Sequence, residues 1–180
     1  MPIKIIQWNQ NRFYSRLEFL QSLIDKKQPE TICLQKMNFK GLSSGKLKNY
    51  KAFAKNRSSD HASDGVAICI KDIIHSQEIA ITSNLEVVAT KVMLPTNLYI
   101  CNIYLPNSQH LDEVKLTRIF SQLPKPFIIT GDFNSHNILW GSHKTDTRGA
   151  SETNKRNKSK PSKHRQTNPR PHPPTLEQLT

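Results

Sequence analysis

Short apolar runs of strand length recur along the first 130 residues of this chain, and helical spacing of apolar residues is confined to two segments. The strand-length runs cover residues 4–8, 31–35, 50–54, 65–70, 85–94, 97–105 and 127–130. The helical segments are 12–27 and 111–123, and prolines follow both of them. Because proline cannot continue a helix, both helices are expected to end there. The pattern predicts an α/β chain whose neighbouring strands are mainly antiparallel.

The last thirty residues have a different composition. They hold five of the 11 prolines and seven of the 26 Lys and Arg residues, and Leu176 and Leu179 are their only large aliphatic residues. Such a segment buries too little apolar surface to offset the entropy lost on ordering. We therefore predict a folded domain over 1–150 and a disordered basic tail over 151–180. A tail that binds nucleic acid and a solvated tail without function both fit this composition.

The formal net charge of +12 favours a negatively charged partner, of which nucleic acid is the commonest, although charge that serves solubility alone is the alternative. No run of about 18 apolar residues and no signal-peptide layout is found, so no membrane-spanning segment is expected. The three cysteines are far apart in sequence, which argues against a disulfide scaffold and a structural metal. We expect an intracellular protein, nuclear or cytoplasmic, without a small-molecule cofactor.

The sharpest local signal is an apolar strand that runs directly into Gly131-Asp132-Phe133-Asn134. A buried strand holds its end rigidly, so the polar groups beyond it are fixed in the open. The Asp132 carboxylate can orient or deprotonate a water, and the Asn134 amide can hold a phosphate oxygen. An ordinary Asp/Asn turn after a strand is the alternative, and local chemistry alone favours it.

Two further strands end in residues of interest. Asn9 follows the first apolar run, where a helix N-cap is the better interpretation on local chemistry. Tyr104 ends the run over 97–105, and its hydroxyl can reach a charged substrate group. The alternative for Tyr104 is a half-buried aromatic residue, as most strand tyrosines are.

Taken in order, these segments resemble a known family. The chain shows WN, CLQ, GVAI, IYLPN, GDFN, HNILWGS and TDTRG, over about residues 3 to 149. This series resembles the endonuclease/exonuclease/phosphatase superfamily and is most similar to the endonuclease domain of jockey-type non-LTR retrotransposons. The stretch from GDFN to TDTRG is the specific part of the resemblance.

The resemblance implies a four-layer α/β sandwich of two mixed β-sheets flanked by helices. It also implies Mg²⁺- or Mn²⁺-dependent hydrolysis of a phosphodiester, used in these elements to nick target DNA for reverse transcription. The implied catalytic roles are orientation of the attacking water by Asp132, binding of the scissile phosphate by Asn134 and phosphate contact by Tyr104. Asn9 is implied in the metal-site network, and Arg148 and His136 are implied at the DNA-binding surface.

The sequence departs from the family in two places. Lys36 stands where the family has a metal-binding Glu after Leu-Gln. Mg²⁺ requires hard oxygen ligands, whereas an ammonium supplies none and repels the ion. The family also continues into further strands and an Asp-His pair, and neither His164 nor His172 follows an Asp in this chain. We therefore expect a partial, C-terminally truncated sandwich in which metal binding is doubtful.

Three functions stay open: an active metal-dependent DNA nickase, a catalytically impaired relative, and a non-catalytic basic module that binds DNA or RNA through phosphates. Both departures weigh against the first. If the family fold is present, Asn9, Tyr104, Asp132 and Asn134 should cluster at one rim of the sandwich. The Lys36 ammonium should then lie within about 4 Å of the Asp132 carboxylate.

Overall fold

The computed structural model describes residues 3–9, 14–37, 47–55, 65–106, 113–136, 138, 142–146 and 150. The chain divides into two compact units, Met1–Asn134 and Ser135–Thr180. The strands and helices described below all belong to the first unit. The boundary expected at residue 150 and the tail over 151–180 stay predictions, because 151–180 lie outside the described residues.

The first sheet has the strand order β1-β2-β4-β3. Its strands are β1 (Ile5–Asn9), β2 (Thr31–Gln35), β3 (Tyr50–Lys55) and β4 (Val66–Lys71). β1 and β2 are parallel, and β4 pairs antiparallel with both of its neighbours. A short 3-10 turn (Tyr14–Arg16) and the helix α1 (Leu17–Lys27) connect β1 to β2. α1 buries Leu20 and Ile24 against Trp8 and Leu34 and so covers the outer face of this sheet.

The second sheet has the order β5-β6-β7-β8. Its strands are β5 (Ser76–Ile79), β6 (Glu86–Val92), β7 (Leu98–Tyr104) and β8 (Phe127–Asp132). β7 and β8 are parallel, and the other two pairings are antiparallel. The helix α2 (Glu113–Phe120) packs Leu116 and Ile119 against Val87 and Ile103 on the outer face.

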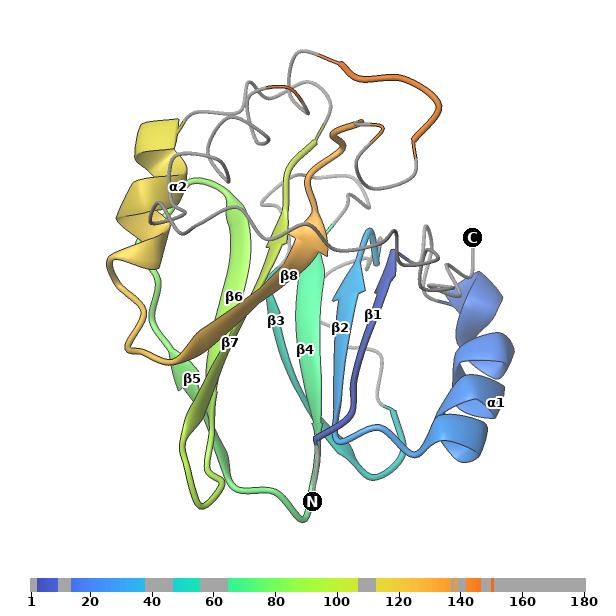
Figure 1. Cartoon of the computed structure of the whole chain (residues 1–180). Coiled ribbons are helices and arrows are strands. Elements are labelled where there is room, and N and C mark those ends of the chain that lie inside the picture. The colour runs from blue at the N-terminus through green and yellow to red at the C-terminus, as the bar shows by residue number, and fades with distance from the viewer. Residues whose placement is uncertain are drawn as a thin grey trace, which may run out of the picture. The chain divides into compact units, whose positions relative to one another are not determined.

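The inner faces of the two sheets pack against each other (Figure 1). Strand residues that point inward supply this interior core, with Cys33 and Ile68 from the first sheet and Val88 and Ile100 from the second. The order of layers is therefore helix, sheet, sheet, helix. This confirms the expected sandwich of two mixed sheets flanked by helices and the mainly antiparallel pairing.

The structure differs from the sequence expectation in the edge strand and in element ends. β5 was not expected, because Ser76-Gln77-Glu78-Ile79 has no apolar run, and its strand conformation comes from pairing with β6. α1 begins at Leu17 rather than residue 12, and α2 covers fewer residues than 111–123. β8 extends through Asp132, beyond the expected end at residue 130.

All three cysteines are free and buried. Burial raises the pKa of the Cys33, Cys69 and Cys101 thiols to about 12. They are therefore core residues, which agrees with the expected lack of a disulfide scaffold. Within the described residues, no helix is both long enough and apolar enough to cross a membrane.

Candidate functional site

Residues from four strand ends meet at one rim of the sandwich. β1 ends at Asn9, β7 at Tyr104 and β8 at Asp132, while Lys36 directly follows β2. Asn9 and Lys36 come from the first sheet and contact Asp132 from the second. These contacts show that the carboxyl ends of both parallel pairs, β1–β2 and β7–β8, lie at the same rim (Figure 1).

Asp132 is the centre of this group. Its Oδ2 accepts a hydrogen bond from Asn9 Nδ2 at 2.7 Å and lies 3.2 Å from Lys36 Nζ. Its Oδ1 accepts a hydrogen bond from the backbone N–H of Asn134 at 2.9 Å. The expected salt bridge between Lys36 and Asp132 is thus confirmed. Asn9 uses its side chain to bind Asp132 across the gap between the sheets, rather than to cap the following helix.

Tyr104 and Asn134 complete the group. The ammonium of Lys36 lies 5.3 Å from the centroid of the Tyr104 ring, a distance at which the ring face attracts a cation. The Asn134 side chain donates from Nδ2 to the Leu105 carbonyl at 2.9 Å, and its backbone has a φ of 46°. All five residues expected at the rim are therefore brought together, while their catalytic and binding roles stay predictions.

Gly131 explains why the polar group begins with glycine. A Cβ added at this position would lie 2.1 Å from the Ile103 carbonyl oxygen, so any other residue would push β8 away from β7. The Gly131 carbonyl also accepts a hydrogen bond from Gln7 Nε2 at 2.8 Å. Close approach to β7 and the bond from β1 together fix the position of the next residue, Asp132.

A buried polar network lies beneath the rim and was missed by sequence reasoning. Asn102, which has no exposed surface, donates from Nδ2 to the carbonyls of Leu34 and Ala67, both at 2.9 Å. Its Oδ1 accepts from Gln35 Nε2 at 2.6 Å and from Thr130 Oγ1 at 3.3 Å. The network thus links β2 and β4 to β7 and β8. The available signal was an Asn inside an apolar strand, two residues before Tyr104 and therefore on the same face.

Two predicted DNA-binding residues, His136 and Arg148, belong to the second unit. His136 is exposed and belongs to the second unit, where its backbone N–H donates to Asp146 Oδ2 at 3.1 Å. Its carbonyl accepts from the Asp146 N–H at 2.9 Å, which closes a loop within that unit. Arg148 lies outside the described residues. The DNA-binding roles of both residues stay predictions.

The residues around Asp132 do not fit a divalent cation. Among the described residues, no three His, Cys, Asp or Glu side chains are grouped as a metal-ligand set. Mg²⁺ and Mn²⁺ prefer oxygen ligands, and carboxylates above all. Here the Asp132 carboxylate is paired with an ammonium at 3.2 Å and accepts from two N–H donors. Lys36 contributes a positive charge where a bound cation would need a negative one.

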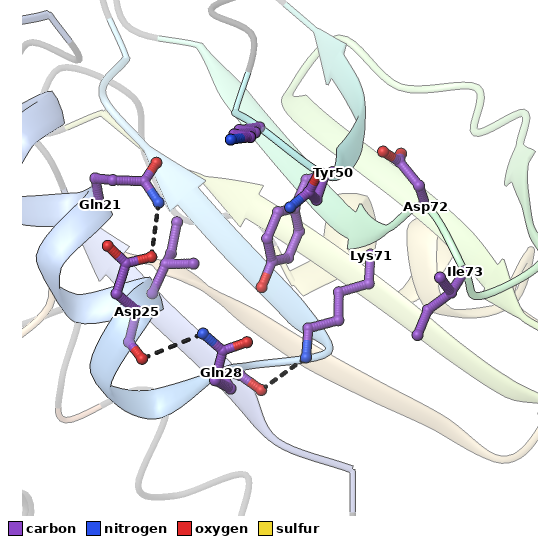
Figure 2. Close-up of a pocket in the computed structure, with 10 residues that line it drawn as sticks. Gln21, Asp25, Gln28, Tyr50, Lys71, Asp72 and Ile73 are labelled. Carbon is purple, nitrogen blue, oxygen red and sulfur yellow. Dashed lines mark hydrogen bonds between the residues drawn. The ribbon is translucent and has the colours of Figure 1, made fainter.

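A separate pocket of about 790 Å³ lies at the opposite end of the first sheet, lined by α1 and by the ends of β3 and β4. Figure 2 shows Gln21 and Asp25 on the helix side and Lys71 reaching the Gln28 carbonyl, a hydrogen bond of 3.1 Å. Lys71 also forms an ion pair with Glu30 at 3.7 Å. None of the predicted site residues lines this pocket.

Comparison with protein families and sequences finds similar proteins. A family model described as endonuclease-reverse transcriptase matches residues 98–176. A probable RNA-directed DNA polymerase from transposon X-element of Drosophila melanogaster is 24% identical over 153 residues, which is 83% of this chain. A corresponding protein from transposon BS of the same organism is 22% identical over 82% of this chain. The chain spans 17% of the length of each of these relatives.

Solved structures share the fold. The endonuclease domain of TRAS1, a telomere-specific non-LTR retrotransposon, superposes with a TM-score of 0.72 and 19% identity, covering 88% of this chain and 72% of that domain. An AP endonuclease from Archaeoglobus fulgidus has a TM-score of 0.56 and 18% identity, covering 86% and 69% of the two chains. A 3'-5' exonuclease from Neisseria meningitidis has a TM-score of 0.57 and 20% identity, covering 74% and 58%.

The family model, the two transposon relatives and the shared sandwich agree with the sequence motifs that end at the rim. The chain is thus similar to the non-LTR retrotransposon endonucleases of the endonuclease/exonuclease/phosphatase superfamily.

Proposed function

We propose that this chain is a DNA-binding relative of the retrotransposon endonucleases in which metal-dependent cleavage is impaired. The observation that carries this proposal is the contact of 3.2 Å between Lys36 Nζ and Asp132 Oδ2. DNA is the proposed partner because the chain is similar to this family and has a net charge of +12. The site of action is proposed to be intracellular, where a retrotransposon enzyme meets its target.

Impairment follows from what an ammonium lacks. Nucleases of this superfamily generally depend on a divalent metal. Such a metal polarises a phosphoryl oxygen and orients the reacting groups through several ligand positions at once. Lys36 carries one positive charge and three N–H donors, so it can neutralise part of a phosphate charge. It cannot coordinate a water and a phosphoryl oxygen together in a fixed geometry, as a metal ion does.

The exposure of two side chains at the rim supports phosphate binding. The Lys36 side chain is 23% exposed, so an anion that reaches the rim meets its ammonium. Asn134 is only partly buried beside it. An incoming phosphate competes with Asp132 for Lys36, which predicts binding that weakens as salt rises.

Nicking of supercoiled plasmid DNA tests the proposal. The wild-type chain and Asp132→Ala are incubated with plasmid in Mg²⁺, in Mn²⁺ and in EDTA, and the nicked fraction is measured over time. We expect no difference between the two proteins in any buffer. Efficient metal-dependent nicking, with many plasmids cut per protein molecule, that disappears in Asp132→Ala would show that Lys36 does not impair catalysis. Nicking by both proteins alike would identify a contaminating nuclease.

The second candidate is a non-catalytic basic module that binds nucleic acid, DNA or RNA, with no residual cleavage. The charge favours it, since Lys and Arg number 26 against 14 acidic residues. Cleavage of an oligonucleotide at high enzyme concentration distinguishes the candidates. Slow cleavage that Asp132→Ala abolishes supports the impaired enzyme, and its complete absence together with salt-sensitive binding supports the module.

A further inference from the structure

We propose that Lys36 acts as a built-in cation that joins the two sheets at the rim, so that the fold does not need a divalent ion there. The inference rests on the Lys36–Asp132 contact that also carries the proposed function. It concerns folding rather than cleavage, so it is tested without DNA. The consequence is that a carboxylate at position 36 should make the stability of the chain depend on divalent cations.

Lys36 is held in place by its neighbours along the chain. Gln35 has no exposed surface and Met37 is 1% exposed, so the backbone on both sides is anchored in the core. Lys36 itself turns the chain with a φ of 54°, a left-handed conformation that few residues adopt. The following N–H, of Met37, donates to the Gly65 carbonyl at 3.5 Å. The side chain therefore starts from a fixed point at the rim and does not belong to a free loop.

The contact with Asp132 joins one sheet to the other. Lys36 follows β2 of the first sheet, whereas Asp132 ends β8 of the second. Two hydrogen bonds from uncharged side-chain amides cross the same gap, from Asn9 to the Asp132 carboxylate and from Gln7 to the Gly131 carbonyl. The Asp132 side chain is only 17% exposed, so water screens its charge incompletely. Lys36, with the face of the Tyr104 ring behind it, supplies the compensating charge.

Replacement of this ammonium by a carboxylate reverses the electrostatics. In Lys36→Glu, two carboxylates face each other across the gap and repel, which loosens the join between the sheets. A divalent ion relieves the repulsion because both carboxylates are hard oxygen ligands. The side-chain carbonyl of Asn9, whose amide nitrogen already contacts Asp132, offers a third oxygen.

A matched control lies at the opposite end of the first sheet. Lys71 pairs with Glu30 at 3.7 Å, and these side chains are 20% and 29% exposed, close to the 23% and 17% of Lys36 and Asp132. Lys71→Glu likewise brings two carboxylates together, but both lie at the same end of the first sheet and neither joins it to the second. A general effect of divalent ions on acidic variants would therefore appear in both substitutions.

Thermal unfolding of the full chain tests the inference, with wild type, Lys36→Met, Lys36→Glu and Lys71→Glu each measured in EDTA, Mg²⁺ and Mn²⁺. We expect the wild-type Tm to be the same in all three buffers. Lys36→Met should unfold about 2–4 °C lower and stay insensitive to the ions. Lys36→Glu should be the least stable protein in EDTA and should regain several degrees in Mn²⁺, in contrast to Lys71→Glu.

Three results would overturn the inference: a wild-type Tm that rises in Mn²⁺ as much as that of Lys36→Glu, a Lys36→Met variant as stable as wild type, or equal rescue of Lys71→Glu. If Lys36→Glu does not fold in any buffer, a double-mutant cycle of Lys36→Met with Asp132→Asn decides. If the loss in unfolding free energy of the double variant differs from the sum of the two single losses, the bridge is supported. If the single losses add up to the double loss, the inference is overturned. Because DNA is absent, failure here leaves the nicking result standing as the separate test of the proposed function.

Discussion

Asp132 owes its position to a residue that has no side chain. Gly131 allows β8 to approach the Ile103 carbonyl closely, and the next residue is thereby set between Asn9 and Lys36. A single added methyl group between these strands has a large effect, because packed backbones cannot move apart without losing their hydrogen-bond ladder.

Gly131→Ala is accordingly expected to reduce the free energy of unfolding by about 1–3 kcal/mol, the range for overpacking a filled site. The new Cβ would lie 2.1 Å from a backbone oxygen, which has little freedom to yield. Urea denaturation measures the change. Ile128→Ala is the control in the same strand. Ile128 is 38% exposed, so its truncation removes less buried surface than truncation of a fully buried isoleucine would. An equal or greater loss in the control would show that the close approach is not what Gly131 protects.

The buried thiols give a second prediction at the residue scale. Burial raises the pKa of Cys33, Cys69 and Cys101 to about 12. Exposed thiols of the unfolded chain lose their protons at about pH 8.5. Between that pH and the native pKa, the unfolded state therefore binds fewer protons than the native state. The stability that the neutral thiols contribute is therefore complete below about pH 8.5 and falls as the pH rises towards 12. Labelling with a chromogenic disulfide at pH 8 should be slow in the native chain and rapid in urea; fast native labelling would contradict their burial.

Elements are joined across the sandwich by side chains as well as by apolar packing. Asn102 on β7 bonds the backbones of β2 and β4, and it accepts from Gln35 and Thr130. Thr90 on β6 is the opposite case, because its buried Oγ1 has no hydrogen-bond partner in the part of the chain that the structure describes. A satisfied buried polar group supports a fold, whereas an unsatisfied one costs free energy.

The two positions should therefore respond in opposite directions to an apolar replacement. Asn102→Leu removes the hydrogen bonds from Asn102 to two carbonyls and the acceptor of Gln35 Nε2, and a loss of about 2–4 kcal/mol in unfolding free energy is expected. Thr90→Val keeps the shape and removes an unpaired hydroxyl, so it should be neutral or stabilising by up to about 1 kcal/mol. Chemical denaturation of both variants at one pH measures the difference. Equal destabilisation would mean that packing, rather than hydrogen bonding, decides both sites.

The whole molecule carries a net charge of +12, to which the last thirty residues contribute seven of the 26 basic side chains and two of the 14 acidic ones. Contacts of such residues with phosphates release condensed counterions, so affinity for duplex DNA should fall steeply and without regard to sequence as salt rises. The slope of log affinity against log salt reports the number of phosphates contacted, at about 0.9 per phosphate.

Deletion of residues 151–180 should make this slope shallower and leave binding otherwise intact. Fluorescence anisotropy of a labelled duplex over a salt series measures it, with a duplex of scrambled sequence as the test of sequence indifference. A slope that the deletion leaves unchanged would show that this segment makes no phosphate contacts.

Much of the architecture could be predicted from local sequence. The periodicity of apolar residues identified both helices and every strand except β5, because alternation and helical spacing are properties of neighbouring residues. The polar residues at the ends of these strands, such as Asn9 and Asp132, could likewise be named in advance. Local chemistry did not predict a role for these residues in a site. Taken alone, it favoured a helix cap for Asn9 and a simple turn for Asp132.

The tertiary structure decided which distant groups meet. The pairing of β5 with β6, the network around Asn102 and the contact between Lys36 and Asp132 each join residues that are separate in sequence. Lys36 and Asp132 are 96 positions apart, and only the packing of one sheet on the other brings an ammonium within 3.2 Å of that carboxylate. The sequence by itself thus determined the helices, the strands other than β5 and the chemistry available at their ends. The geometry of the site came from burial of two sheet faces against each other, a global property that no local pattern contains.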